Sequence, residues 1–282
     1  MGHEEMVRAL IEMSADINKA GNDGGTPLYL AAGHDNEAVL RALIEAGANV
    51  HKVTEAGESP LLVATERGHE AVVRALIEAD ADVSKAKNDG VTPLLMAACN
   101  GHETLVRVLI EAGADVNKAT DGGETALFIA AEFAHDVVVR ALIELGADVN
   151  KAVDNGATPL FIAACNGHEA AVRALIELGA DANKAEDSGT TPLYVAAQQG
   201  HETVVRALIE LGADANEVMD DGATALYIAA ENGQEAVVRA LLEAGADVNI
   251  ATDDDWTALY IAAENGQTAV LRALLEAGAR QR

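Results

Sequence analysis

Aromatic side chains are scarce in this sequence of 282 residues, which contains three Phe, four Tyr and one Trp. Half of the residues are nevertheless hydrophobic. Most of these are Ala, Leu, Val and Ile, which fill the narrow space between closely packed helices. The composition therefore indicates an all-α fold and not a domain built around large aromatic residues.

Cysteine, long apolar segments and positive charge are also in short supply. Two cysteines are too few for a small secreted domain held together by disulfides, so we expect a reducing, cytoplasmic location. No run of about 18 apolar residues predicts a membrane span, and the first residues do not resemble an export signal. The 19 basic and 46 acidic residues give a net charge of −27, which disfavours nucleic acid and anionic membranes and favours basic partners.

Repetition is what the sequence has in abundance. A Thr or Ser recurs every 33 residues without an insertion or deletion, at Thr26, Ser59, Thr92, Thr125, Thr158, Thr191, Thr224 and Thr257. We therefore expect one array over residues 1–282. It comprises a partial N-terminal unit in residues 1–20, seven internal units in residues 21–251 and a C-terminal unit in residues 252–282.

Each unit has the pattern of a helix, a turn, a second helix and an extended loop. In one unit, Thr92 and Pro93 suit a helix start, because the hydroxyl caps free N–H groups and proline fits the first helical position. Gly101 ends this short helix. A second helix is expected from about His102 to Ala112, followed by Gly113 as a left-handed cap.

The motifs T-P-L-x-x-A-A, G-H-E-x-V-V-R-x-L-I-E and G-A-D-V-N, at a 33-residue period, resemble the ankyrin repeat family along the whole chain. The resemblance implies a curved solenoid of helix-turn-helix units with β-turn fingers. It also implies that a concave side, made of fingers and inner helices, binds other proteins.

The sequence departs from the family pattern at two kinds of position. Tyr, Phe or Leu follows T-P-L where the family commonly has His, so we expect apolar packing in place of the hydrogen bonds of that imidazole. Asp80 replaces a helix-cap glycine, and Asp255 replaces the glycine of the last finger. A left-handed backbone is less favourable for Asp than for Gly, so we expect local strain or reshaping there.

No group of residues predicts catalysis, a cofactor or a metal site. Stacked helices lie roughly 8 to 10 Å apart, so the histidines of successive G-H motifs cannot share a zinc ion, and we expect them to form hydrogen bonds at the second helix. The same spacing places Cys99 and Cys165 two units apart, too far for a disulfide. No nucleophile stands beside a base and an orienting group, and no phosphate-binding glycine motif is present.

Most basic residues fall into two periodic sets and leave no nucleic-acid footprint. The arginine set comprises Arg8, Arg41, Arg74, Arg107, Arg140, Arg173, Arg206, Arg239 and Arg272. Each of these precedes a Glu by four residues, as Arg107 precedes Glu111, which predicts ion pairs on a solvent-exposed helical face. The lysine set runs from Lys19 to Lys184.

The expected fingers are strongly acidic, and the C-terminal half is the most acidic. Beyond Lys184 the lysine set is replaced by Glu217 and Ile250, and Trp256 stands in the last finger. An aromatic side chain beside carboxylates suits a basic or aromatic ligand. We predict that a protein or peptide with a basic segment contacts Asp187, Gln198, Asp220, Asp221, Glu231, Asp253, Asp254, Asp255, Trp256 and Glu264.

The acidic fingers also admit two interpretations that involve no protein partner. Turns favour Asp, and extra acid keeps a long array soluble. Alternatively, Asp253, Asp254 and Asp255 bind calcium, although consecutive side chains seldom converge on one ion.

The function predicted from these patterns is that of a non-enzymatic protein-binding scaffold. The alternative is a structural spacer, or an engineered or truncated repeat scaffold with no ligand of its own. The near-identity of the units favours the alternative, whereas irregular residues such as Met96 and Phe133 oppose pure consensus design. Apolar residues of the first and last units, Leu10 and Leu275 among them, predict a monomer or weak end-to-end association.

Overall fold

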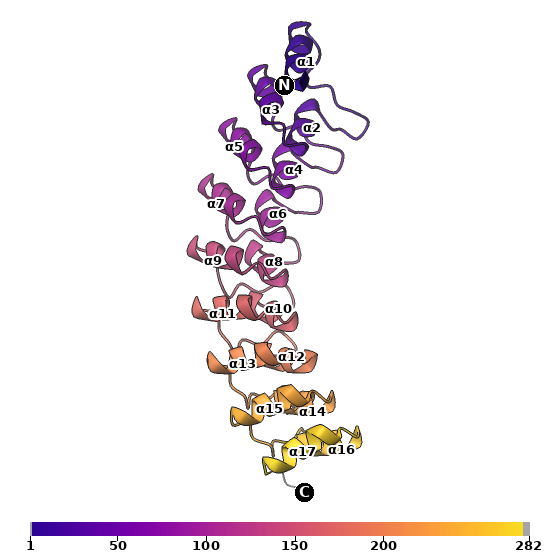
Figure 1. Cartoon of the computed structure of the whole chain (residues 1–282), viewed down its shortest axis with the longest axis vertical. Coiled ribbons are helices and arrows are strands. Elements are labelled where there is room, and N and C mark those ends of the chain that lie inside the picture. The colour runs from indigo at the N-terminus through magenta and orange to yellow at the C-terminus, as the bar shows by residue number, and fades with distance from the viewer. Residues whose placement is uncertain (1, 279–282) are drawn as a thin grey trace. The chain divides into compact units, whose positions relative to one another are not determined.

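The computed structural model describes residues 2–278, which form seventeen α-helices and no β-strand (Figure 1). The first helix is α1 (Gly2–Glu12). The inner helices are α2 (Pro27–Gly33), α4 (Pro60–Glu66), α6 (Pro93–Cys99), α8 (Ala126–Glu132), α10 (Pro159–Cys165), α12 (Pro192–Gln199), α14 (Ala225–Glu231) and α16 (Ala258–Glu264). The outer helices are α3 (Glu37–Glu45), α5 (Glu70–Glu78), α7 (Glu103–Glu111), α9 (Asp136–Glu144), α11 (Glu169–Glu177), α13 (Glu202–Glu210), α15 (Glu235–Glu243) and α17 (Thr268–Glu276). The expected all-α repeat architecture is confirmed.

The periodic Thr starts the inner helices as expected. The Thr191 hydroxyl accepts a hydrogen bond from the backbone N–H of Tyr194 at 3.2 Å, and Pro192 occupies the first helical position. Helices of seven to nine residues are unstable alone. Burial of side chains such as Leu175 and Leu208, both 0% exposed, therefore supplies much of their stability.

The outer helices α5, α7, α11 and α13 begin differently, because their leading histidines do not cap the helix. The Nε2 atom of His168 lies 2.9 Å from the carbonyl oxygen of Glu132, and that of His201 lies 3.0 Å from the carbonyl oxygen of Cys165. These histidines therefore form hydrogen bonds, as expected, but their partners end the inner helix of the preceding repeat, α8 for His168 and α10 for His201.

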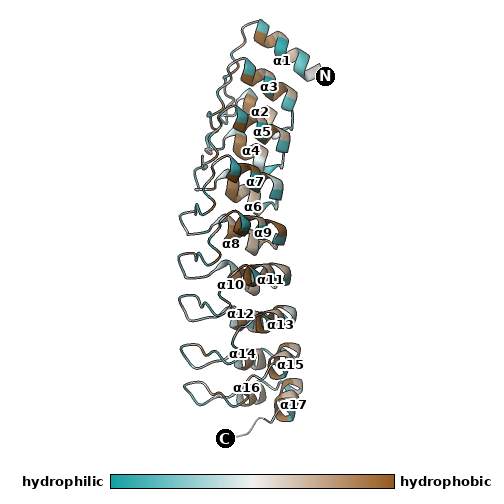
Figure 2. Ribbon diagram, turned by 90° about the vertical axis from the view of Figure 1, so that its left-hand side faces the viewer, coloured by the Kyte–Doolittle hydropathy of each residue, from teal (hydrophilic) through white to brown (hydrophobic). Residues whose placement is uncertain are grey.

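Contacts divide the chain into two compact bodies of several repeats each, which we call the first unit and the second unit. The first unit is Met1–Ile129 with Ala141–Ala147, and the second unit is Ala130–Arg140 with Asp148–Arg282. In the first unit, α2, α4 and α6 pack in one row, and α1, α3, α5 and α7 pack in another. In the second unit, α10, α12, α14 and α16 form the inner row, and α11, α13, α15 and α17 form the outer row. Figure 2 shows that the loops of this second unit project on the side of its inner helices.

The loops form the expected β-turn fingers. In the last finger, the N–H of Thr252 donates to the carbonyl of Trp256 at 2.9 Å, and isolated bridges join Val218 to Thr224 and Ala251 to Thr257. Neighbouring fingers are also joined, because the N–H of Asp253 donates to the carbonyl of Asp221 at 2.9 Å. The backbone thus fixes the spacing of the finger side chains.

The two glycine replacements do not reshape the backbone. Asp80 and Asp255 have φ angles of 61° and 63°, so both keep the left-handed conformation at some cost in strain. In the preceding finger, a Cβ added at Gly222 would lie 3.1 Å from the Cα of Thr252 in the next finger. The Asp255 side chain is exposed in the structure.

Three other expectations can be compared with the structure. Cys99 and Cys165 end α6 and α10, and neither forms a disulfide. No helix within residues 2–278 has the length and apolar composition needed to cross a bilayer. In the last repeat, Leu275 is exposed, but Leu259 and Leu274 are buried. The apolar face of this repeat is therefore less open than the repeat pattern predicts.

Candidate functional site

The six predicted finger aspartates of the second unit are all exposed: Asp187, Asp220, Asp221, Asp253, Asp254 and Asp255. The fingers hold them through local hydrogen bonds. The Oδ1 atom of Asp221 accepts the N–H of Ala223 at 3.0 Å, and the N–H of Asp187 donates to the carbonyl of Asn155 at 2.9 Å. These contacts fix the turns and leave carboxylate oxygens available to a partner.

The ends of the inner helices add further predicted residues to the same side of the second unit. Glu231 and Glu264 are the last residues of α14 and α16, and Gln198 lies near the end of α12. Gln198 and Glu264 are exposed, and Glu231 is partly buried. We call the six finger aspartates together with Glu231 and Glu264 the acidic finger surface.

Two tyrosines show which of these carboxylates the fold brings close together. Burial raises the pKa of Tyr194 to about 12, and the charges of Asp221 and Glu231 add to the effect. Burial also raises the pKa of Tyr227, followed by the charges of Glu231, Asp221 and Asp254. Asp221 and Glu231 therefore act on both phenols, and Asp254 acts on that of Tyr227. We take these three carboxylates as the centre of the acidic finger surface.

An exposed aromatic pair borders this centre. The rings of Trp256 and Tyr260 have centroids 4.9 Å apart and planes tilted by 45°, and the two residues are 39% and 50% exposed. Trp256 comes from the last finger, and Tyr260 from the first turn of α16. The pair offers ring faces and edges beside carboxylates.

The aromatic residues after T-P-L are more than apolar packing groups, so that expectation is wrong in part. In the first unit, the Tyr29 hydroxyl donates to a carboxylate oxygen of Glu58 at 2.6 Å, a hydrogen bond to the next finger. Leu95 is buried as expected. Tyr194, Tyr227 and Tyr260 were not predicted as site residues, although tyrosine recurring at one position beside acidic fingers was a usable signal.

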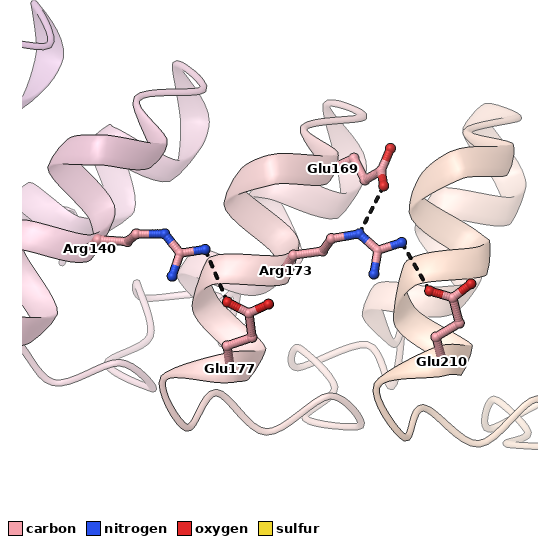
Figure 3. A network of polar contacts seen from close by, with 5 residues as sticks. All are labelled: Arg140, Glu169, Arg173, Glu177 and Glu210. Atoms are coloured by element: carbon pink, nitrogen blue, oxygen red, sulfur yellow. Dashed lines mark hydrogen bonds and ion pairs between the residues drawn. The ribbon is translucent and has the colours of Figure 1, made fainter.

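On the outer helices, unlike on the acidic finger surface, glutamate carboxylates pair with arginines. Figure 3 shows Arg173 between two glutamates: its Nε donates to Glu169 at 2.9 Å, and its Nη2 donates to Glu210 of the next outer helix at 3.0 Å. Arg140 reaches Glu177 in the same way at 3.0 Å. The contacts that join successive outer helices in this manner form the outer ladder.

The predicted pairing of each arginine with the glutamate four residues later is wrong. Arg107 pairs with Glu103, four residues earlier, at 2.6 Å, and with Glu144 of the next outer helix at 3.0 Å. Helical side chains point toward the N-terminus, so an arginine reaches back along its own helix and not forward to Glu111.

Within residues 2–278, none of the eight carboxylates of the acidic finger surface forms an ion pair. Nor do any three His, Cys, Asp or Glu side chains of this part of the chain converge as metal ligands. Asp253, Asp254 and Asp255 therefore give the calcium alternative no support. The acidic finger surface combines unpaired negative charge with aromatic rings on a hydrogen-bonded frame.

Comparison with known proteins bears on the repeat itself. A family model described as ankyrin repeats (3 copies) matches residues 43–120, 61–153, 118–186, 151–219, 171–252 and 211–282. A second model, described as ankyrin repeats (many copies), matches residues 1–44. A search of curated proteins found no match. The family models together cover the chain from its first residue to its last, and the chain belongs to the ankyrin repeat family.

Proposed function

We propose that this protein is a binding scaffold whose acidic finger surface holds a lysine- or arginine-rich segment of another protein. Ankyrin repeats generally mediate protein–protein binding, and the family is typically non-enzymatic. The basic partner, the concave surface that binds it and a reducing, cytoplasmic location are parts of the proposal.

The contrast between the two sides of the second unit carries the proposal. Outer-helix glutamates such as Glu177 and Glu210 pair with arginines, whereas the eight carboxylates of the acidic finger surface have no cation among the described residues. Like charges held close together by a fixed backbone repel each other. A basic segment relieves this repulsion on binding, which favours association and accelerates it.

The aromatic pair gives such a segment an anchor. An arginine guanidinium stacks on Trp or Tyr and binds carboxylates through its N–H groups at the same time. Trp256 and Tyr260 lie within one finger and helix start, next to Asp254 and Asp255. Arginine is therefore expected to bind this end better than lysine.

A charge-matched pair of variants tests the proposal. The finger variant carries Asp221→Asn, Glu231→Gln and Asp254→Asn. The control carries Glu177→Gln, Glu210→Gln and Glu243→Gln on the outer helices, and its net charge changes by the same amount. Binding of a fluorescent peptide of alternating arginine and glycine is followed by anisotropy at physiological salt.

We expect the finger variant to bind the peptide at least about tenfold more weakly than the parent, the equivalent of about 1.4 kcal/mol, while the control changes by less than about threefold. Equal losses in both variants would mean that only net charge matters, and the proposal would fail.

The alternative of a spacer without a ligand is favoured by the regularity of the outer ladder, which joins the outer helices of successive repeats by the same contact. Absence of peptide binding by the parent, and of any partner trapped by cross-linking in a cell extract, would favour this alternative.

A further inference from the structure

The loops that lead into the fingers are joined by asparagines at one position of the repeat. The side-chain Oδ1 of each accepts the backbone N–H of the residue 31 positions later, in the loop of the next repeat, at 2.7 to 3.0 Å. We call these asparagines the asparagine row: Asn18 bonded to Asn49, Asn150 to Asp181, Asn183 to Asp214 and Asn216 to Asp247.

Lysines add a second bond to the asparagine row. The Nζ of Lys52 donates to the backbone carbonyl of Asn18 at 2.8 Å, and that of Lys184 donates to the backbone carbonyl of Asn150 at 3.1 Å. Asn18 and Asn150 thus each supply two acceptors to the next repeat, a side-chain oxygen for an N–H group and a carbonyl oxygen for an ammonium group.

His51 interrupts the asparagine row in the first unit, because it stands where the row has asparagine. Asp82 and Lys85 occupy the positions that Asp181 and Lys184 occupy at the next repeat after Asn150. Within residues 2–278, neither the backbone N–H of Asp82 nor the Nζ of Lys85 has a hydrogen-bond acceptor. Two donors that are bonded elsewhere in the array are therefore free at the interruption.

A cavity of about 250 Å³ lies at the interruption. Its polar lining comprises His51, Ser59, Asp82 and Lys85, and its apolar lining includes Val50 and Ala81. Ser59 occupies a position at which every other repeat has threonine, so it lacks a methyl group that fills space elsewhere. The free donors thus face a space that a small molecule can enter.

We propose that this cavity binds the carboxylate of a small organic acid with a short aliphatic tail. A carboxylate has the planar shape of the missing carboxamide and accepts the N–H of Asp82 in its place. Its negative charge also suits the Lys85 ammonium, and hydrogen bonds between charged groups are stronger than neutral ones. The apolar part of the lining covers the tail. The acidic finger surface is not involved.

The charges around the cavity favour a small ligand with a single carboxylate. The net charge of −27 repels a protein segment with several acidic residues. The carboxylate of Asp82 belongs to the lining, although its Oδ1 accepts the N–H of Ser84 at 2.9 Å. It opposes a ligand with two negative charges, such as phosphate, and keeps the affinity for a monocarboxylate modest.

Butyrate serves as the probe, and NMR of the isotope-labelled full chain follows the backbone amide of Asp82 at constant ionic strength. We expect a saturable shift of this resonance with a Kd below about 10 mM. Acetate should bind about threefold more weakly, because it has less apolar surface to bury. Inorganic phosphate and a capped Gly-Glu-Gly-Glu-Gly peptide should bind at least about tenfold more weakly than butyrate.

The variant His51→Asn tests the site without removing a contact that the fold needs. The introduced carboxamide should accept the N–H of Asp82, as that of Asn150 accepts the N–H of Asp181. Butyrate binding should therefore be lost while the fold is preserved, because asparagine occupies this position elsewhere in the array.

A pair of lysine variants separates the site from the overall charge. Lys85→Gln should weaken butyrate binding at least about tenfold. Lys184→Gln removes the same charge from an ammonium already bonded to Asn150, and it should bind butyrate like the parent. The proposal is overturned if butyrate causes no saturable shift at Asp82, if His51→Asn binds like the parent, or if the two lysine variants bind alike. Tighter binding of phosphate or of the peptide than of butyrate would also overturn it.

Discussion

Replacing Gly167 by alanine is expected to destabilise the second unit by about 1 to 3 kcal/mol. Gly167 has a φ angle of 77°, and the left-handed region costs an L-residue roughly 1 to 2 kcal/mol. An added Cβ would lie 2.8 Å from two atoms of the His201 ring, so the ring must move away from the carbonyl of Cys165 that it now contacts at 3.0 Å. A stiffer unfolded chain offsets only about 0.4 to 1 kcal/mol of this loss.

The chain contains its own control for this perturbation. Ala134 occupies the position equivalent to Gly167 in another repeat and has a φ angle of 61°. Ala134→Gly relieves the left-handed strain but loosens the unfolded chain, so we expect a gain of at most about 1 kcal/mol. The two substitutions should thus shift stability in opposite directions.

Urea unfolding followed by far-ultraviolet circular dichroism measures both effects. The data should be fitted with a nearest-neighbour repeat model, because long arrays do not unfold in one two-state step. The reasoning is refuted if Gly167→Ala leaves the unfolding of the second unit unchanged, or if Ala134→Gly lowers its stability by as much as Gly167→Ala does.

Three further outcomes are expected. Tyr194 should ionise at about pH 12. Because this folded-state pKa exceeds the ordinary value of 10.0, its contribution to stability is complete below pH 10 and is lost as the pH rises through 12. Tyr194→Phe should reduce the amplitude of the phenolate absorbance step near pH 12, a step to which Tyr29 also contributes because its pKa is raised to about 12. Duplex DNA should not bind at physiological salt, and a tight, salt-sensitive mobility shift would contradict this. High salt should strengthen any end-to-end association measured by sedimentation velocity, because it screens the repulsion between like charges. The double variant Leu271→Glu with Leu275→Lys should reduce this association. A parent that stays monomeric in every condition would exclude it.

The sequence was sufficient to predict the helical repeat, because the residues that start and end each helix recur at fixed spacing. Thr158 caps α10 by accepting the N–H of Phe161 at 3.1 Å, and Gly179 after α11 has a φ angle of 103°. Such signals act over a few residues and can be read from sequence. The division into two compact units has no comparable local signal, because it depends on contacts summed over many residues.

The arginine partners could not be predicted from spacing alone. Arg206 has glutamates four residues away on both sides, but it pairs with Glu202 at 2.9 Å and with Glu243 of the next outer helix at 2.8 Å. Side-chain direction selects the earlier glutamate, and helix-to-helix packing brings in the distant one. Neither appears in the charge pattern of a single helix.

Exposure of the aspartates was predictable at the candidate site, but exposure of the tyrosines was not. Turn residues lie at the surface because their backbone cannot be satisfied in the interior. The position after T-P-L is different: Phe128 is 7% exposed and Tyr260 is 50% exposed. The difference in exposure depends on how far neighbouring side chains bury each ring. The repeat pattern does not specify those neighbours.

The outer ladder has a consequence for how such a chain can change in length. Arg140, Arg173 and Arg206 each bond a glutamate 37 residues later, on the following outer helix. Deleting or duplicating one 33-residue repeat therefore replaces the glutamate partner at the junction by another glutamate. No arginine of the ladder loses its partner. Unequal recombination between repeats therefore leaves these contacts unchanged on the outer helices. The protein can gain or lose binding surface in whole repeats while the outer ladder between repeats stays the same.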